Sequence, residues 1–279
     1  MSPAPFFITH HISSMNTPSQ TTDAAITVGK NKIALSNKRP GRLAASAFLA
    51  GCYIALGGAL SLTVGFGFPG ITAENPALQK LLCGAMFPIG LILVVTLGAE
   101  LFTGNNAMLI PAYMTRQCSL MDIVRNWVMV YLGNFVGAVT FTFILVYYAG
   151  LTDAEIYRNA AIGIAQAKVS MSWGVVFVKG IGANWCVCMG VWMALTARSF
   201  TGKILGCWIP VMAFVVFGYE HCIANMFYFP LGMLHGADVS IMQAITRNMI
   251  PSTLGNIVGG ALMIGTLKTY IHFKKPDNR

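Results

Sequence analysis

The amino-acid sequence predicts an all-α integral membrane protein with six transmembrane helices. Of its 279 residues, 56% are hydrophobic and only 10% are charged, whereas soluble domains carry about 25% charged residues. Six apolar runs each approach the roughly 20 residues that a helix needs to cross a bilayer. These runs begin near Arg42, Leu81, Trp127, Ser170, Ile204 and Met249.

Composition divides the chain into three parts. Residues 1–41 are polar and lack the apolar core of a signal peptide, so we expect a cytoplasmic N-terminal tail that becomes helical from about Thr22. Residues 42–273 contain the six apolar runs and form the transmembrane domain. Residues 274–279 form a second, basic cytoplasmic tail.

The net charge of +9 indicates membrane orientation rather than nucleic-acid binding. When the N-terminus is placed in the cytoplasm, most Lys and Arg residues fall on the cytoplasmic side, as the positive-inside rule requires. The residues expected outside are Lys80, Arg158, Lys168 and Arg247. Both termini of this multi-pass protein are therefore predicted to lie on the cytoplasmic side of the cell membrane. Lys179 falls within a helix, where we expect it to form a buried ion pair.

The expected helix bounds follow from the apolar runs and the turn residues between them. They are residues 42–66, residues 80–113 with an interruption, Trp127 to about residue 149, residues 169–196, Ile204 onward with an interruption, and Met249 to about residue 273. A cytoplasmic loop is expected at residues 115–124 and a short external helix at residues 151–168.

Helices two and five are each predicted to break at mid-membrane. Glu100 and Glu220 lie in otherwise apolar sequence, where an acid costs about 2.5–3.5 kcal/mol. In both places a Gly lies two residues before the Glu, and an Asn lies five residues after it, at Asn105 and Asn225. Such polar interruptions are tolerated at bilayer depth only where protein or a water-filled cavity surrounds them. We expect both Glu side chains to satisfy backbone amides at the breaks.

The two motifs belong to an internal repeat with an offset of about 120 residues. Arg125-Asn126 precedes the Gly-Asn pair at Asn134, and Arg247-Asn248 precedes the Gly-Asn pair at Asn256, with the same spacing. Each half contains three helices, so the second copy enters the membrane from the opposite face. This is an inverted 3+3 repeat, in which sites form at the midplane where broken helices meet.

Most of the seven cysteines lie in apolar runs, where Cys is usually a small buried hydrophobe. No pair has the spacing of a zinc site. We therefore expect no metal and no cofactor.

Three segments resemble the formate/nitrite transporter family. They are Glu100-Leu101-Phe102-Thr103-Gly104-Asn105, Asn184-Trp185, and Glu220-His221-Cys222-Ile223-Ala224-Asn225-Met226. The resemblance covers residues 25–273. It implies a homopentamer in the lipid bilayer, an aquaporin-like outline, and one pore in each protomer for formate or nitrite.

The resemblance also assigns pore residues. Thr103 matches the threonine at the tip of the first break, His221 the central histidine, Asn184 the asparagine of helix four, and Lys168 the lysine of the outer vestibule. The cytoplasmic constriction matches Leu91, Leu101, Phe102 and Val187, and the external constriction matches Phe87 and Phe214.

Elementary physics agrees with these roles. A bare anion that enters an apolar slit loses hydration worth tens of kcal/mol. Donors such as Thr103, Asn184 and the N-termini of half-helices can replace the lost water. A proton can also neutralise the anion, and His221 is the natural proton partner because an unperturbed His titrates near pH 6.5. Protons are thus expected to accompany the anion.

Two other function classes compete with an anion channel. An enzyme would use His221 with Glu220 or Glu100 as acid and base, but Cys222 is the only nucleophile nearby. A water or ammonium channel is a weaker alternative. The Asn75-Pro76-Ala77 tripeptide of water channels is present once and lies between spans, and an external Lys168 disfavours a cation such as ammonium. Inverted broken helices favour transport. Formate and nitrite fit the same donors equally well.

Overall fold

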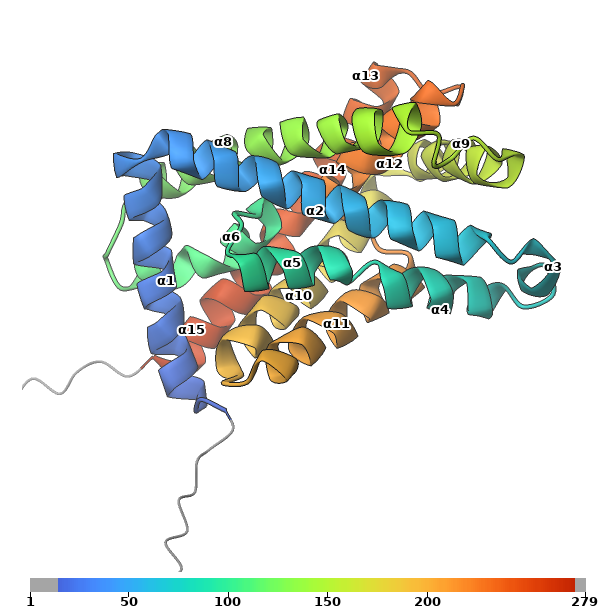
Figure 1. Cartoon of the computed structure of the whole chain (residues 1–279). Helices are drawn as coiled ribbons and strands as arrows, with labels where there is room; N and C mark the ends of the chain where they lie inside the picture. Colours follow the sequence, from blue (N-terminus) through green and yellow to red (C-terminus); the bar gives the residue numbers. More distant parts are fainter. Residues whose placement is uncertain (1–14, 274–279) are drawn as a thin grey trace, which may run out of the picture.

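The computed structural model describes residues 15–273, and every named element in this part of the chain is a helix (Figure 1). Six stretches in it are long and apolar enough to cross a membrane, which confirms the predicted number. They are Pro40–Phe66 (α2), Pro76–Leu97 (α4, Pro76–Met86, and α5, Ile89–Leu97), Leu120–Tyr148 (α8, Leu120–Phe141, and η1, Thr142–Tyr148), Trp173–Thr196 (α10), Phe200–Phe217 (α11) and Ile241–His272. The last comprises α13 (Ile241–Gln243), η2 (Ala244–Met249), α14 (Ile250–Ile257), η3 (Val258–Thr266) and α15 (Leu267–His272).

The largest differences from the predicted starts are in the third and sixth spans, which both begin well before their hydrophobic runs. The third begins at Leu120 rather than near Trp127, because Ser119 and Asp122 form a capping box there. The sixth begins at Ile241 rather than near Met249, after a capping box of Ser240 with Gln243. In both cases polar cap residues, which add nothing to the hydropathy, decide where the helix starts.

The N-terminal segment contains a packed helix, α1 (Pro18–Lys38), which crosses the end of the bundle (Figure 1). It starts before the predicted Thr22, because Thr17 caps it and Pro18 occupies its first position. Ala25 and Gly29 are buried against the bundle. The helix thus forms part of the folded structure, although it was expected within the tail of residues 1–41. The predicted tail at residues 274–279 lies outside the described residues, and the division into three parts stays a prediction.

Both predicted breaks are present. α5 and α11 end at Gly98 (φ 73°) and Gly218 (φ 67°), in the left-handed conformation that Gly adopts at low cost. After a short extended segment, new helices start as α6 (Phe102–Met108) and α12 (Cys222–Leu234). α6 continues into the short α7 (Ile110–Met114).

Counterpart helices of the two halves run in opposite directions. In Figure 1, α2 leads away from the end covered by α1, whereas its counterpart α10 leads toward that end. Likewise α8 leads away from α1, and the span from α13 to α15 returns to it. These directions agree with the inverted repeat expected from the sequence. Two further helices lie between the spans. The short α3 (Pro69–Thr72) follows α2, and α9 (Glu155–Ser170), near the predicted external helix, packs against α12.

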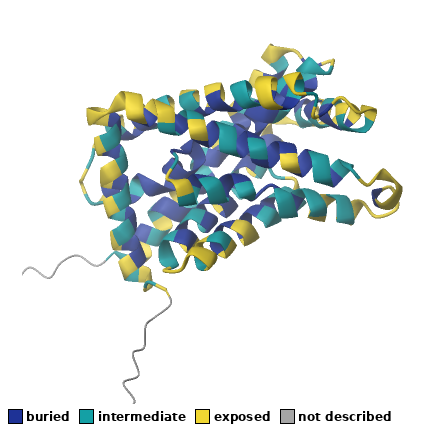
Figure 2. Ribbon diagram, in the orientation of Figure 1, coloured by how far each residue is buried: buried dark blue, intermediate teal, exposed yellow. Residues whose placement is uncertain are grey.

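Burial is concentrated around the two breaks (Figure 2). Every residue of α6 is buried, although this helix contains Thr103, Asn105 and Asn106. Large apolar side chains such as Leu132, Phe143 and Ile209 are instead exposed on the outer faces of the spans. A polar centre within an apolar outer surface is the arrangement expected of a protein that crosses a lipid bilayer.

Candidate functional site

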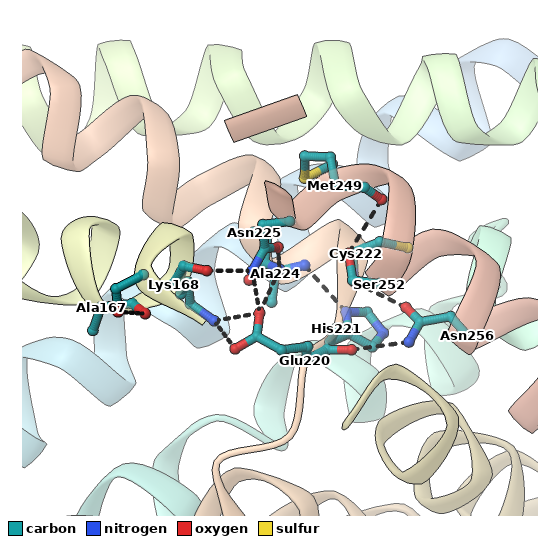
Figure 3. Close-up of polar contacts among 12 residues, drawn as sticks. Ala167, Lys168, Glu220, His221, Cys222, Ala224, Asn225, Met249, Ser252 and Asn256 are labelled. Atoms are coloured by element: carbon teal, nitrogen blue, oxygen red, sulfur yellow. Dashed lines mark hydrogen bonds and ion pairs between the residues drawn. The ribbon is translucent and has the colours of Figure 1, made fainter. Parts of the chain in front are cut away.

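The second break is built around a buried carboxylate. Glu220, 3% exposed, accepts hydrogen bonds from the Lys168 ammonium at 2.9 and 3.0 Å, one to each oxygen (Figure 3). Its Oε2 also accepts from the amides of Asn225 at 2.8 Å and Asn248 at 3.0 Å. Four donated bonds offset the cost of burying this charge. Lys168, expected in an outer vestibule, is therefore held in an ion pair with the buried Glu220, while its own side chain stays 14% exposed.

The first break repeats this network with a different lysine. Glu100 Oε1 accepts from Lys32 at 2.8 Å, and Oε2 accepts from Asn105 at 2.8 Å. Asn105 also donates to Asn126, as Asn225 does to Asn248. The sequence placed Lys32 in the tail and gave it no role. The buried Glu in each half was the available signal, because both require a cation, but Lys32 and Lys168 do not share the offset of the repeat.

The Gly-Asn pairs of the repeat secure the broken backbone. Asn134 accepts from the N–H of Phe102 at 2.9 Å and donates to the carbonyl of Glu100 at 2.9 Å. Asn256 makes the same two contacts with Cys222 and Glu220, at 2.9 and 2.9 Å. Backbone groups freed by the breaks thus find partners inside the protein. The side chains of Glu100 and Glu220 bind lysines and amides instead of the backbone amides that were expected.

The two half-helices meet at a histidine and a threonine. His221 Nε2 lies 3.0 Å from Thr103 Oγ1, and Nδ1 accepts the N–H of Ala224 at 3.1 Å. Because Nδ1 accepts, the proton of the neutral ring lies on Nε2 and is donated to Thr103. The Thr103 hydroxyl hydrogen then remains free for another acceptor. The predicted contact between these residues across the repeat is present.

Aromatic rings flank this meeting point. Phe214 stacks on the His221 ring with centroids 5.8 Å apart, and Phe87 meets Phe214 edge-on at 5.6 Å. The two residues predicted for the external constriction therefore lie together beside the histidine. Of the four predicted for the cytoplasmic constriction, Leu91 and Leu101 line the cavity described below, while Phe102 and Val187 are buried outside its lining.

Asn184 ties the two halves together. Its amide donates to the Thr103 carbonyl at 3.1 Å, to Asn106 Oδ1 at 3.1 Å and to the Asn256 carbonyl at 2.6 Å. Protein acceptors therefore engage both of its N–H groups, and its oxygen accepts from the Cys188 thiol at 3.4 Å. Its role as a donor to an anion stays a prediction, since such an anion would have to replace one of these bonds.

A cavity of about 590 Å³ leads from the end covered by α1 to the first break. Its polar lining includes Lys32, Asn31, Glu100, Asn105 and Lys203, and the rest is mainly aliphatic. The Lys32–Glu100 pair therefore faces open space.

Two further expectations concern charge and metal. Among the described residues Lys179 forms no ion pair, so that prediction is wrong; its contribution is the main-chain carbonyl, which accepts the N–H of Glu220 at 3.3 Å. No group of three or more His, Cys, Asp or Glu side chains in the described part of the chain could hold a metal ion.

Comparison with known proteins identifies the family of this chain. The family described as formate/nitrite transporter matches residues 19–270. The probable formate transporter of Methanothermobacter thermautotrophicus is 38% identical, over 94% of this chain and 99% of its own. The formate channel of Haemophilus influenzae is 35% identical, over 91% of this chain and 94% of its own.

Solved structures agree with the fold. A structure described as an ion channel of the same family superposes with a TM-score of 0.82 and 31% identity, over 92% of this chain and 99% of its own. A pentameric formate channel with formate bound superposes with a TM-score of 0.73 and 33% identity, over 85% and 99%. The fold and the paired breaks are those of a multi-pass membrane channel. The chain belongs to the formate/nitrite transporter family, whose members are channels and transporters, and this favours transport over the enzyme alternative.

Proposed function

We propose that this protein is a channel for small monovalent anions, with formate as the main substrate and nitrite as a second. The observation that carries the proposal is the Thr103–His221 pair at 3.0 Å, located where the two half-helices begin. It presents a hydroxyl hydrogen and a ring N–H in a buried place. The formate channels among the relatives support the choice of substrate.

The proposed path of the anion has three positions along the pore. An anion enters the cavity beside Lys32, passes Thr103 and His221, and leaves beside Lys168. Both lysines carry carboxylate partners, so each presents a partly neutralised charge that attracts an anion without trapping it. Between the lysines the donors of Thr103 and His221 replace hydration, and the N-termini of α6 and α12 add favourable partial charge. The six predicted constriction residues keep this segment narrow.

A proton is proposed to accompany the anion at His221. In the resting tautomer Nδ1 is occupied by the Ala224 N–H, so a proton that arrives at Nδ1 must break this bond. The charged ring therefore forms only while an anion beside Nε2 compensates it. This makes proton uptake dependent on the anion.

The proposal includes the assembly and its orientation. The pentameric formate channel that superposes on this chain supports a homopentamer in the cell membrane. The first described helix, α1, covers one end of the bundle, and the last, α15, packs against it there (Figure 1). Two termini at one end fit the cytoplasmic location inferred from the charge distribution.

Uptake into proteoliposomes tests the function. Formate, nitrite and ammonium are offered separately at pH 5.5 and pH 7.5, and internal pH is recorded with a trapped dye. We expect formate and nitrite uptake that is faster at the lower pH and acidifies the lumen, which indicates that a proton enters with the anion, but no ammonium uptake. Rates equal to those of empty liposomes for both anions would overturn the proposal.

A further inference from the structure

One hydrogen bond joins two residues at equivalent positions of the repeat. Tyr131 and Thr253 are separated by 122 residues, as are Asn134 and Asn256, and their hydroxyl groups lie 3.1 Å apart. When two halves are related by an approximate two-fold axis, only residues near that axis can touch their own counterparts. The Tyr131–Thr253 bond therefore lies near the axis that relates the halves.

Each member of this pair supports the start of one half-helix. The Tyr131 ring meets the ring of Phe102 edge-on, with centroids 5.0 Å apart. Thr253 lies on α14 one helix turn before Asn256, whose side-chain oxygen accepts the N–H of Cys222 at 2.9 Å. Phe102 and Cys222 are the first residues of α6 and α12. The Tyr131–Thr253 bond thus links the starts of α6 and α12, next to Thr103 and His221.

The Tyr131–Thr253 bond becomes more important for holding the helix starts together when an anion is present. An anion seated between Thr103 and His221 interrupts their direct bond. Among the hydrogen bonds of the described residues, those of the Asn184 amide and the Tyr131–Thr253 bond still join the two halves there. These decide how far the helix starts can separate to admit a larger ion.

We propose that the Tyr131–Thr253 bond determines the size selectivity of the pore, favouring formate and nitrite over acetate and larger carboxylates. This inference rests on the proposed channel function. Acetate has the same charge and the same carboxylate as formate but adds a methyl group, so it separates the effect of width from the effect of charge.

The test compares acetate and formate uptake in proteoliposomes of Tyr131→Phe, Thr253→Val and the double variant. Each single change removes one hydroxyl and keeps the shape of the side chain. We expect the acetate-to-formate ratio to rise about two-fold to ten-fold in each single variant, since a net hydrogen bond is worth about 0.5–1.5 kcal/mol. The double variant should match the singles, because both changes remove the same bond.

Three further variants complete the design. Thr253→Ser keeps the hydroxyl and should keep the wild-type ratio. Tyr148→Phe and Thr246→Val remove exposed hydroxyls from the same two spans and should leave the ratio unchanged. An unchanged ratio in both Tyr131→Phe and Thr253→Val, with formate uptake intact, would overturn the inference. Absence of formate uptake by the wild type would instead overturn the proposed function.

Discussion

The two breaks share one scaffold but differ in enclosure and in chemistry. Glu220 receives four hydrogen bonds, and Lys168 and Asn248 help to enclose it. Glu100 receives two and lines the open cavity. The residue before α12 is His221, whose ring caps that helix, whereas the residue before α6 is Leu101, which provides no side-chain cap.

The difference teaches which parts of the repeat are structural and which are functional. The carboxylate, its lysine and the two asparagines recur in both halves, as a scaffold that closes a broken helix must. The residues that meet at the centre are not counterparts, since Thr103 belongs to the first helix turn of α6 and His221 precedes α12. The repeat thus supplies a symmetric frame, and an asymmetric pair inside it supplies the chemistry.

The largest expected difference between the breaks is in stability. Glu220→Gln leaves the partly buried Lys168 without its counter-charge, and losing one partner of a buried pair costs up to about 3–5 kcal/mol. Glu100→Gln should cost distinctly less, because Lys32 can be solvated from the cavity. Thermal unfolding in detergent measures both. If both variants lowered the melting temperature equally, the enclosure of the second break would make no difference to stability.

The second prediction concerns the asymmetric pair. His221→Phe removes the ring N–H that faces Thr103 and the acceptor for the Ala224 N–H, so proton-linked formate uptake should fall to the level of empty liposomes. The pentamer should persist on size-exclusion chromatography, because the Glu220 network is untouched. His272→Phe, at the end of α15, is a control distant from the breaks. Unchanged uptake at acidic external pH in His221→Phe would remove the ring from the mechanism.

The partner of His221 should show a smaller effect. Thr103→Val keeps the shape but loses the hydroxyl, and formate flux should fall by an amount that corresponds to about 1–3 kcal/mol, the cost of a buried group left unpaired. Thr103→Ser keeps the hydroxyl and should retain most of the flux. If Thr103 only shaped the turn, Ser would be at least as damaging as Val. Uptake rates of the two variants decide between these outcomes.

The smallest effect is expected at the mouth of the open half. Lys203 is exposed and lines the cavity, so Lys203→Gln should slow formate efflux from that side modestly at low ionic strength. The difference should vanish at high salt, because exposed charges are screened over about 10 Å at 0.1 M. Lys30→Gln removes an exposed charge of α1 that is not part of the cavity lining. The predicted role of Lys203 is wrong if both variants slow efflux equally, or if the slower efflux of Lys203→Gln persists at high salt.

The sequence alone determined the six spans, the two breaks and the repeat. These features are local, because a run of apolar residues, a Gly and a Glu with fixed spacing can be recognised without knowing what lies opposite. The motif around His221 also carried the family resemblance, and with it the meeting of Thr103 and His221. Helix starts at Leu120 and Ile241 were missed because caps are polar and short.

Tertiary structure decided which groups neutralise and brace the breaks. Lys32 reaches Glu100 across 68 residues, and Asn184 reaches Thr103 across 81. Neither contact follows the offset of the repeat, so no spacing in the chain could reveal it. A buried carboxylate requires a cation, but which lysine supplies it depends on how α1 and α9 pack against the bundle. The sequence shows that a charge must be compensated, and packing chooses the residue that does so.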